Sequence, residues 1–448
     1  MADLLVEEGL PGLFVVQARR AELWAEARRA DLVAALRRHE VGLHGRDVHP
    51  VPPELVERLD WAGGVAALLE SERGELETLG RVLDAPPVCL SEHRGFGAPQ
   101  LFAVARQLGR PYLFGFPAAP PAHSVSRYAG ALNVPFDSPV DGFLGFFPAV
   151  FDDVLHDDRP FQSLLARLRA HVAAADQAGL PLLVVFTCHP ERLCYAGPLE
   201  RWQYGNGLNR DPAAVPPGVE QRRGRAEVER ALANLRTLLR YLRDSPELTP
   251  ITVAELVRRY GAQPNRLERA ELAAAAAQAL ESGQIVGGAR ASAAETLLAW
   301  CDALASPDAE PPARSPRRDV LGPTEPPPLA PELATLEPVA LATLAGRLLF
   351  GAAQTGHLPA ALELDGRAIG LGSLYGALAA AYLAADRGQP PATVRLEAWP
   401  RYPALAGPLG QRFRRCAEDP LIRPDLSTDA LARHAALQSW TLKPAPRQ

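Results

Sequence analysis

The chain has 448 residues, a formal net charge of -5 at pH 7 and a sequence pI near 6.1. This acidic balance, without a concentrated basic face, argues against nucleic acid as the main partner. No run of about 18 apolar residues occurs and the first residues do not resemble a signal peptide, so we expect a cytoplasmic protein with no membrane span. The five cysteines form no Cys-x-x-Cys pair, and they predict neither a disulfide framework nor a cysteine-based zinc site.

Short apolar runs alternate with helical patterns over the first half of the chain. Strands are expected at 12–17, 41–43, 87–90, 111–114, 129–134 and 182–187, and helices at 20–38, 52–72 (one helix or a pair), 98–108 and 160–178. Strands separated by helices at this spacing imply βαβ units and a parallel sheet. The sequence therefore predicts an open or barrel-like α/β domain.

The composition changes beyond Asp211, and four regions are expected. A helix from Arg225 to Leu242 closes the first region, and capping-box patterns at Thr252 and Ser292 then open helices rich in alanine and leucine. A proline-dense stretch follows, which is typical of a linker. The four regions are an α/β domain at 1–245, a helical extension at 246–305, a proline-rich linker at 306–332 and a mainly helical accessory domain at 333–448.

The stretch from His39 to Pro50 contains three histidines and two carboxylates where a helical pattern gives way to a short apolar run. Imidazole is a common ligand of divalent metals, and a carboxylate often completes such a site. His44, Asp47 and His49 follow the expected strand, at the sheet edge where α/β folds build their sites. They are candidate metal ligands. The alternative is a polar loop whose histidines are incidental.

A second loop, from Ser91 to Pro99, also follows an expected strand. It combines Glu92, His93 and Arg94 with two glycines that allow a backbone to approach a ligand closely. The alternative is a glycine-rich turn that only starts the next helix.

His189 follows the apolar run 182–187, which is the clearest strand pattern of the chain. A histidine at this place is a candidate acid or base, and the alternative is a structural histidine with satisfied hydrogen bonds. Cys188 is not favoured as a nucleophile beside it, because adjacent residues on a strand point to opposite faces.

The segment 201–209 places aromatic and amide side chains together. Trp202, Tyr204 and Asn206 are candidates for binding sugars, because aromatic faces stack on sugar rings and amides hydrogen-bond their hydroxyl groups. The alternative is a lid that packs on the domain.

The run Phe14-Val15-Val16, a helix, and then His39-Glu40-Val41-Gly42-Leu43-His44 with His49-Pro50 occur in the order of a known family. With 59–65, 98–100 and 186–190, they resemble a divergent branch of the polysaccharide deacetylase (NodB-homology) family. The resemblance covers Met1 to Asp211, just under half of the chain. The His-Glu-Val-Gly-x-His element is its most specific part.

The resemblance implies a distorted (β/α) barrel that hydrolyses N-acetyl groups on an amino-sugar polymer. In that family a divalent metal, usually zinc, is held by an Asp and two His, and metal binding lowers the pKa of water to about 7. By resemblance, His44 and His49 are the metal histidines, with Asp47 as the candidate carboxylate beside them. His189 is the late general acid, and Arg94 loosely matches an arginine-proline motif.

The chain departs from the family at two places. The family's paired-Asp motif lies on a first strand upstream of the element that matches 2–9, and His44 and His49 are more widely spaced than the family's metal histidines. We therefore expect a barrel lacking its first strand, with weak metal affinity and little deacetylase activity. Two interpretations stay open: a chain that starts downstream of the true start, or a catalytically dead protein that binds carbohydrate or the cell envelope.

The accessory region offers one further resemblance. The turn at Gly356-His357-Leu358-Pro359 and the expected hairpin at Asp365-Gly366 are similar to a small cell-wall-glycan-binding repeat. A plain helical accessory domain is the alternative. The sequence predicts no oligomeric state.

Overall fold

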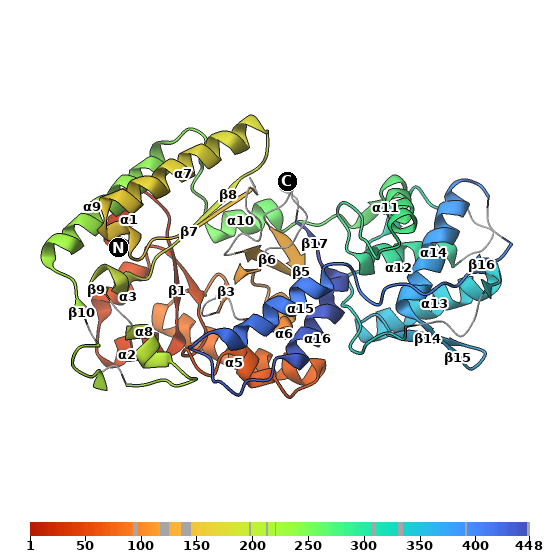
Figure 1. The fold of residues 1–448 in the computed structure, drawn as a ribbon, viewed down its shortest axis with the longest axis horizontal. Coiled ribbons are helices and arrows are strands. Elements are labelled where there is room, and N and C mark those ends of the chain that lie inside the picture. The colour runs from red at the N-terminus through yellow and green to blue at the C-terminus, as the bar shows by residue number, and fades with distance from the viewer. Residues whose placement is uncertain are drawn as a thin grey trace.

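The computed structural model describes residues 1–92, 97–116, 125–135, 145–196, 199–211, 214–219, 221–305, 311–329, 335–389 and 392–445. It shows two lobes along the longest axis (Figure 1). The larger lobe contains the N-terminus and the main sheet. The smaller lobe is built from α11 (Arg269–Ser282), α12 (Ala293–Leu304), α13 (Pro338–Thr355) and α14 (Leu371–Asp386). In the part of the chain described, no helix is long and apolar enough to cross a membrane.

The main sheet has seven strands in the order β1-β2-β3-β4-β6-β5-β17. Its members are β1 (Leu13–Val16), β2 (Glu40–Leu43), β3 (Leu90–Ser91), β4 (Tyr112–Gly115), β5 (Ser126–Tyr128), β6 (Ala131–Pro135) and β17 (Lys443–Pro444). All neighbours from β1 to β6 pair in parallel, whereas β5 runs antiparallel to both β6 and β17. The prediction of an α/β fold with a mainly parallel sheet is confirmed.

A separate two-stranded ribbon lies beside the main sheet. It pairs β7 (Phe146–Val150) in parallel with β8 (Leu183–Thr187). The strand expected at 182–187 is therefore present, but among the described residues it pairs with β7 and not with the main sheet. Pro148 inside β7 has no backbone N–H, which is why that segment does not read as a strand in the sequence.

Helices connect the strands. They are α1 (Ala2–Glu7), α2 (Ala18–Glu26), α3 (Ala30–Leu36), α4 (Pro52–Val56), α5 (Trp61–Leu83), α6 (Pro99–Gln107), α7 (Asp158–Gln177), α8 (Leu199–Tyr204), α9 (Arg225–Asp244) and α10 (Val253–Tyr260). The single helix expected at 20–38 is two helices, because Arg28 adopts a positive φ of 54° that no helix tolerates. The helix expected to end near Glu72 instead continues to Leu83, and Asp60 caps its start by accepting a hydrogen bond from Gly63.

One apolar core joins the main sheet to the β7–β8 ribbon. It is formed by residues from the strands of both sheets, from α10 and from the position before β3: Cys89, Leu113, Leu132, Val134, Phe146, Leu183, Val253, Leu256 and Tyr260, with Val15 and Val185 packed against them. Since side chains alternate between the faces of a strand, this shared core means that the two sheets face one interior.

The C-terminal segment returns to the larger lobe. There α15 (Ala406–Arg415) and α16 (Asp429–Gln438) contribute Phe413 and Leu431 to the core around α5 and α6, and β17 completes the edge of the main sheet. Residues of the region 333–448 thus contribute to both lobes (Figure 1). Local sequence patterns do not indicate such a return, because the contacts that hold it join residues far apart in the sequence. For example, Tyr128 donates a hydrogen bond to the carbonyl of Ala435, 307 positions away.

Small antiparallel pairs complete the fold. They are β9 (Tyr195–Ala196) with β10 (Gln221–Arg222), β11 (Arg266–Glu268) with β12 (Arg314–Pro316), β13 (Thr335–Leu336) with β16 (Val394–Arg395), and β14 (Ala361–Leu364) with β15 (Arg367–Gly370). The hairpin expected at Asp365-Gly366 is confirmed as the turn between β14 and β15. Both turn residues have positive φ, 51° and 73°, which matches the twist of a two-residue hairpin.

Candidate functional site

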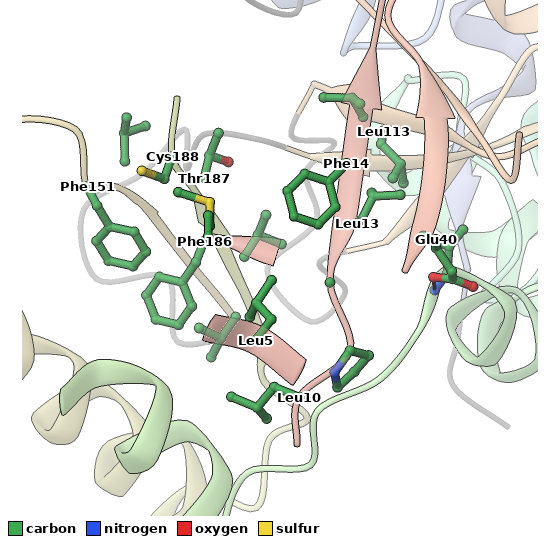
Figure 2. A pocket seen from close by; sticks show the side chains of 18 of the residues that line it. Leu5, Leu10, Leu13, Phe14, Glu40, Leu113, Phe151, Phe186, Thr187 and Cys188 are labelled. Carbon is green, nitrogen blue, oxygen red and sulfur yellow. Dashed lines mark hydrogen bonds between the residues drawn. The ribbon is translucent and has the colours of Figure 1, made fainter. Parts of the chain in front are cut away.

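A cavity of about 2060 Å³ lies between β1 and the β7–β8 ribbon (Figure 2). Five strands direct the residues at their carboxyl ends to it: Gln17, His44, Glu92, Asp152 and His189 follow β1, β2, β3, β7 and β8. We call this end of the cavity the mouth. The carboxyl ends of parallel strands are where α/β folds place their functional groups.

His189 and Asp152 form a hydrogen-bonded pair at the mouth. Val150 and Thr187 are register partners at the ends of β7 and β8. Asp152 and His189 each follow two positions later, and they therefore lie side by side. The ring Nδ1 of His189 lies 2.9 Å from Oδ2 of Asp152, and the backbone N–H of His189 donates to Oδ1 at 2.9 Å. Because the ionised Asp152 can only accept, Nδ1 of His189 carries the proton of this hydrogen bond.

The charge of Asp152 is stabilised by this contact. Burial alone would raise the pKa of Asp152, but the side-chain and backbone hydrogen bonds from His189 outweigh it and hold the pKa below its usual range. A carboxylate that stays ionised beside an imidazole fixes the ring and stabilises its protonated form. The sequence did not indicate Asp152, because the strand before it was not recognised.

His44 is held by the next strand. Its Nδ1 lies 2.9 Å from the hydroxyl of Ser91, and that hydroxyl donates to the carbonyl of Leu43 at 3.2 Å. Since the hydroxyl hydrogen is used for Leu43, the oxygen accepts from Nδ1–H of His44. The ring of His44 is therefore oriented through Nδ1 by Ser91.

Glu92 places a buried carboxyl at the mouth. Its Oε1 has no hydrogen-bond partner among the described residues, and burial raises its pKa well above the usual range, with a further contribution from Glu72. Glu72 is a buried carboxyl on α5, and burial, aided by Glu75, raises the pKa of Glu72 to about 7. Burial therefore favours the neutral, protonated form of Glu92. Glu72 is a residue that sequence reasoning missed, because it looks like one more polar position on a helix.

The three predicted metal ligands do not come together at the mouth. His44 lines the cavity, whereas His49 and Asp47 are not among the described residues that line it. Both ring nitrogens of buried His49 are engaged, Nδ1 with Glu54 at 3.0 Å and Nε2 with the carbonyl of Tyr204 at 2.9 Å. Asp47 accepts a hydrogen bond from the backbone N–H of Val48 at 2.9 Å. The described part of the chain contains no group of three His, Cys, Asp or Glu that could hold a metal ion.

The predicted sugar-binding residues lie at two places. Tyr204 lines the main cavity, and its hydroxyl accepts a hydrogen bond from Arg20 at 2.8 Å. Trp202 and Asn206 line a smaller cavity of about 290 Å³, where the guanidinium of Arg210 lies 5.9 Å from the centre of a Trp202 ring. The predicted catalytic Arg94 lies outside the described residues.

Comparisons with known proteins add no assignment. No family model matches the chain, and no curated protein matches it either. The site is therefore interpreted from its own chemistry.

Proposed function

We propose that the chain is a polysaccharide-deacetylase-like hydrolase that removes N-acetyl groups from amino-sugar polymers at the mouth of the main cavity. The observation that carries this proposal is the pair of His189 and Asp152, which shares the cavity with the buried carboxyl of Glu92, whose pKa is raised by burial. Amide hydrolysis needs a base for the attacking water and an acid for the leaving nitrogen, and these residues supply both.

The proposed steps follow from the protonation states. Nε2 of His189 takes a proton from water while the water oxygen attacks the acetyl carbonyl carbon, and Asp152 stabilises the imidazolium that forms. Glu92 gives its proton to the amide nitrogen as the C–N bond breaks. The products are acetate and the free amino sugar. The resemblance assigns His189 as a late acid, and here it is proposed as the base that later returns its proton to Glu92.

A divalent metal is not part of these steps, because the predicted ligand set does not fit one. His49 would have to give up its contact with either Glu54 or the Tyr204 carbonyl before the released ring nitrogen could accept a metal. His44 meets the requirement of a ligand better, since its ring is oriented through Nδ1 by Ser91. Zinc therefore enters the proposal only as a ligand to be tested.

The proposed fold is a distorted (β/α) barrel. It is supported by the interior that the main sheet and the β7–β8 ribbon share, to which β4, β6, β7 and β8 contribute, together with Cys89 just before β3. It is also supported by the mouth, where five carboxyl ends of strands meet.

A carbohydrate-binding protein without catalysis is the second candidate. It is favoured by the small cavity beside Trp202 and Asn206, which offers an aromatic face and a side-chain amide away from the mouth. In that case replacing Trp202 by Ala would weaken binding of a sugar oligomer, and the mouth residues would have no effect on it.

Acetate release from an N-acetylated glucosamine oligomer by the whole chain tests the proposal. We expect slow but measurable release that persists in a chelator and falls by about 10²–10⁴ in His189→Ala. Oligomer binding with no acetate release, lost in Trp202→Ala, would instead establish the binding protein. One-to-one zinc binding in calorimetry, with release abolished by the chelator, would show that the described residues rearrange to hold a metal.

A further inference from the structure

The main cavity extends away from the mouth as a cleft between β1 and β8. Every residue from Leu13 to Gln17 lines it, and so does every residue from Leu182 to Cys188. Because side chains alternate between the two faces of a strand, a space that touches every successive residue runs along the edge of the strand. We call this space the edge cleft. Figure 2 shows its two sides, with Phe14 across from Phe186 and Cys188.

The edge of β1 directs unpaired backbone groups into the edge cleft. The carbonyl of Val16 accepts a hydrogen bond from the backbone N–H of His44 at 3.0 Å, so Val16 faces β2. In a parallel pair, alternate residues direct their N–H and C=O groups to opposite sides of the strand. Leu13 and Val15 therefore direct theirs away from β2 and towards the cleft.

The edge of β8 does the same from the other side. Leu183 donates to the carbonyl of Gly145 at 3.0 Å and Thr187 accepts from Phe151 at 3.0 Å, so both face β7. The residues between them at 184 and 186 face the cleft instead. Within the described residues, no hydrogen bond satisfies the backbone groups of these two positions or of the two on β1.

The walls of the edge cleft are mainly apolar. They include Leu5 and Leu10 near α1, Trp24 and Leu36 from α2 and α3, and Leu235 from α9. Two chemistries suit such walls, an acyl chain and a polypeptide strand. An acyl chain would leave the backbone groups of both edges without partners in an apolar space, which is costly. The side chains of a polypeptide strand can pack against the apolar walls, and its backbone can hydrogen-bond to the unpaired groups of both edges.

We propose that the edge cleft receives an extended apolar polypeptide segment as a strand that pairs with both β1 and β8. In Figure 2 the two edges run in the same direction, from Leu10 to Phe14 and from Phe186 to Cys188, so one strand can pair with both in a regular ladder. Both of its faces would be buried, so the segment is rich in Val, Ile and Leu rather than alternating with polar residues. The inserted strand joins the β7–β8 ribbon to the main sheet. This inference does not rest on the proposed hydrolysis.

The probe is a synthetic heptapeptide of Val, Ile and Thr with two lysines at each end for solubility. We expect saturable binding to the whole chain, together with at least tenfold slower hydrogen exchange at the amides of Leu13, Val15, Val184 and Phe186. The same peptide with alternate amides N-methylated keeps the side chains but loses one ladder of hydrogen bonds. It should bind at least tenfold more weakly.

A variant of the protein gives an independent test. Val184→Pro removes an N–H that faces the edge cleft and breaks no bond between β7 and β8, so the fold should persist and peptide binding should fall at least tenfold. Circular dichroism verifies the fold. Absence of binding, or equal binding of the two peptides, would overturn the proposal. So would a lysophospholipid that displaces the peptide while leaving exchange at the four amides fast, because the cleft would then be a lipid site.

Discussion

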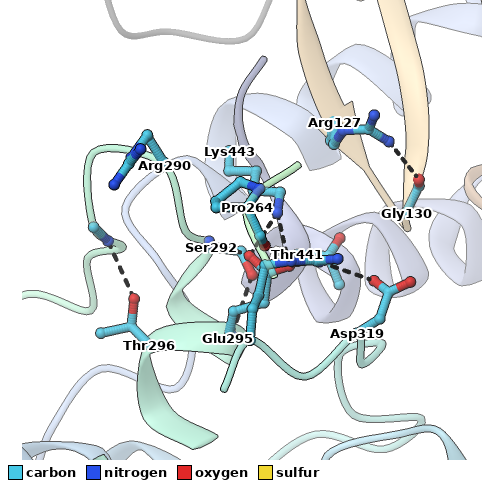
Figure 3. Close-up of polar contacts among 12 residues, drawn as sticks. Arg127, Gly130, Pro264, Arg290, Ser292, Glu295, Thr296, Asp319, Thr441 and Lys443 are labelled. Carbon is cyan, nitrogen blue, oxygen red and sulfur yellow. Dashed lines mark hydrogen bonds and ion pairs between the residues drawn. The ribbon is translucent and has the colours of Figure 1, made fainter. Parts of the chain in front are cut away.

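Lys443 places its ammonium nitrogen 2.7 Å from both carboxylate oxygens of Glu295, and both side chains are about 95% buried, with exposures of 5% and 4%. Lys443 belongs to β17 of the main sheet, whereas Glu295 lies in the first turn of α12 in the smaller lobe (Figure 3). The guanidinium of Arg317 lies 2.6 Å from the same carboxylate, and the backbone N–H of Ser292 donates to it at 2.9 Å. This network fastens the returning C-terminal segment to the smaller lobe.

Removal of Lys443 should therefore destabilise the whole chain. Lys443→Met leaves Glu295 with an incomplete set of partners in a buried site, and we expect the free energy of unfolding to fall by about 3 kcal/mol. Denaturant titration measures it. Arg314→Met is the matched control, because its contact with Glu268 is exposed and is worth less than about 1 kcal/mol. Equal effects of the two substitutions would contradict the buried role of the network.

The buried acid on α5 should make stability depend on pH. The pKa of Glu72 is raised to about 7 in the folded chain by burial and by Glu75, whereas it is near its usual value in the unfolded chain. The folded state then holds more protons, so the free energy of unfolding falls as pH rises from about 4.5 to about 7. Glu72→Gln should raise it by roughly 1–3 kcal/mol at pH 8 and change it little at pH 4.

The control for this measurement is on the same helix. Glu70 is exposed, so Glu70→Gln should leave the pH dependence unchanged. Glu92 keeps a raised pKa in both variants, so some fall of stability with pH should remain. A Glu72→Gln variant with an unaltered slope between pH 4 and pH 8 would show that this carboxyl is ionised in the folded chain.

His49 should behave as a structural residue. Its two ring nitrogens join Glu54 to the backbone of Tyr204, so His49→Ala leaves buried polar groups without partners and should cost about 2 kcal/mol of unfolding free energy. Thermal unfolding and a zinc titration are compared for the variant and the wild type. Lost zinc affinity at unchanged stability would restore the role of His49 as a metal ligand.

Local patterns predicted the parts of the fold that depend on local burial. The apolar runs at 12–17 and 111–114 became parallel strands because each contributes described side chains to two different apolar cores. The apolar run at 182–187 likewise predicted the strand that His189 follows. It did not reveal Asp152, because that residue follows a strand interrupted by Pro148. The return of β17 to β5 also escaped prediction, since pairing between distant segments is set by tertiary packing.

The sequence predicted where the candidate site lies better than it predicted which residues form it. His44 and His189 line one cavity, as their places after strands suggested. Spacing in the sequence could not show that the ring of His49 contacts Glu54, because this contact depends on where the first turn of α4 places the Glu54 side chain. Glu54 is the third residue of α4, and its carboxylate also accepts a hydrogen bond from the backbone N–H of Val51 at 2.9 Å.

The most direct test of the proposed site compares two adjacent carboxylates. Asp152 holds Nδ1 of His189, whereas Asp153 contacts Arg192 at 2.7 Å and is not bonded to His189 in the described structure. Acetate release from the N-acetylated oligomer is measured for Asp152→Asn and Asp153→Asn at equal protein concentration. We predict a loss of about 10²–10⁴ in kcat for Asp152→Asn and less than a threefold change for Asp153→Asn. Equal rates in the two variants and the wild type would contradict the assignment of His189 and Asp152 as the proton-transferring pair.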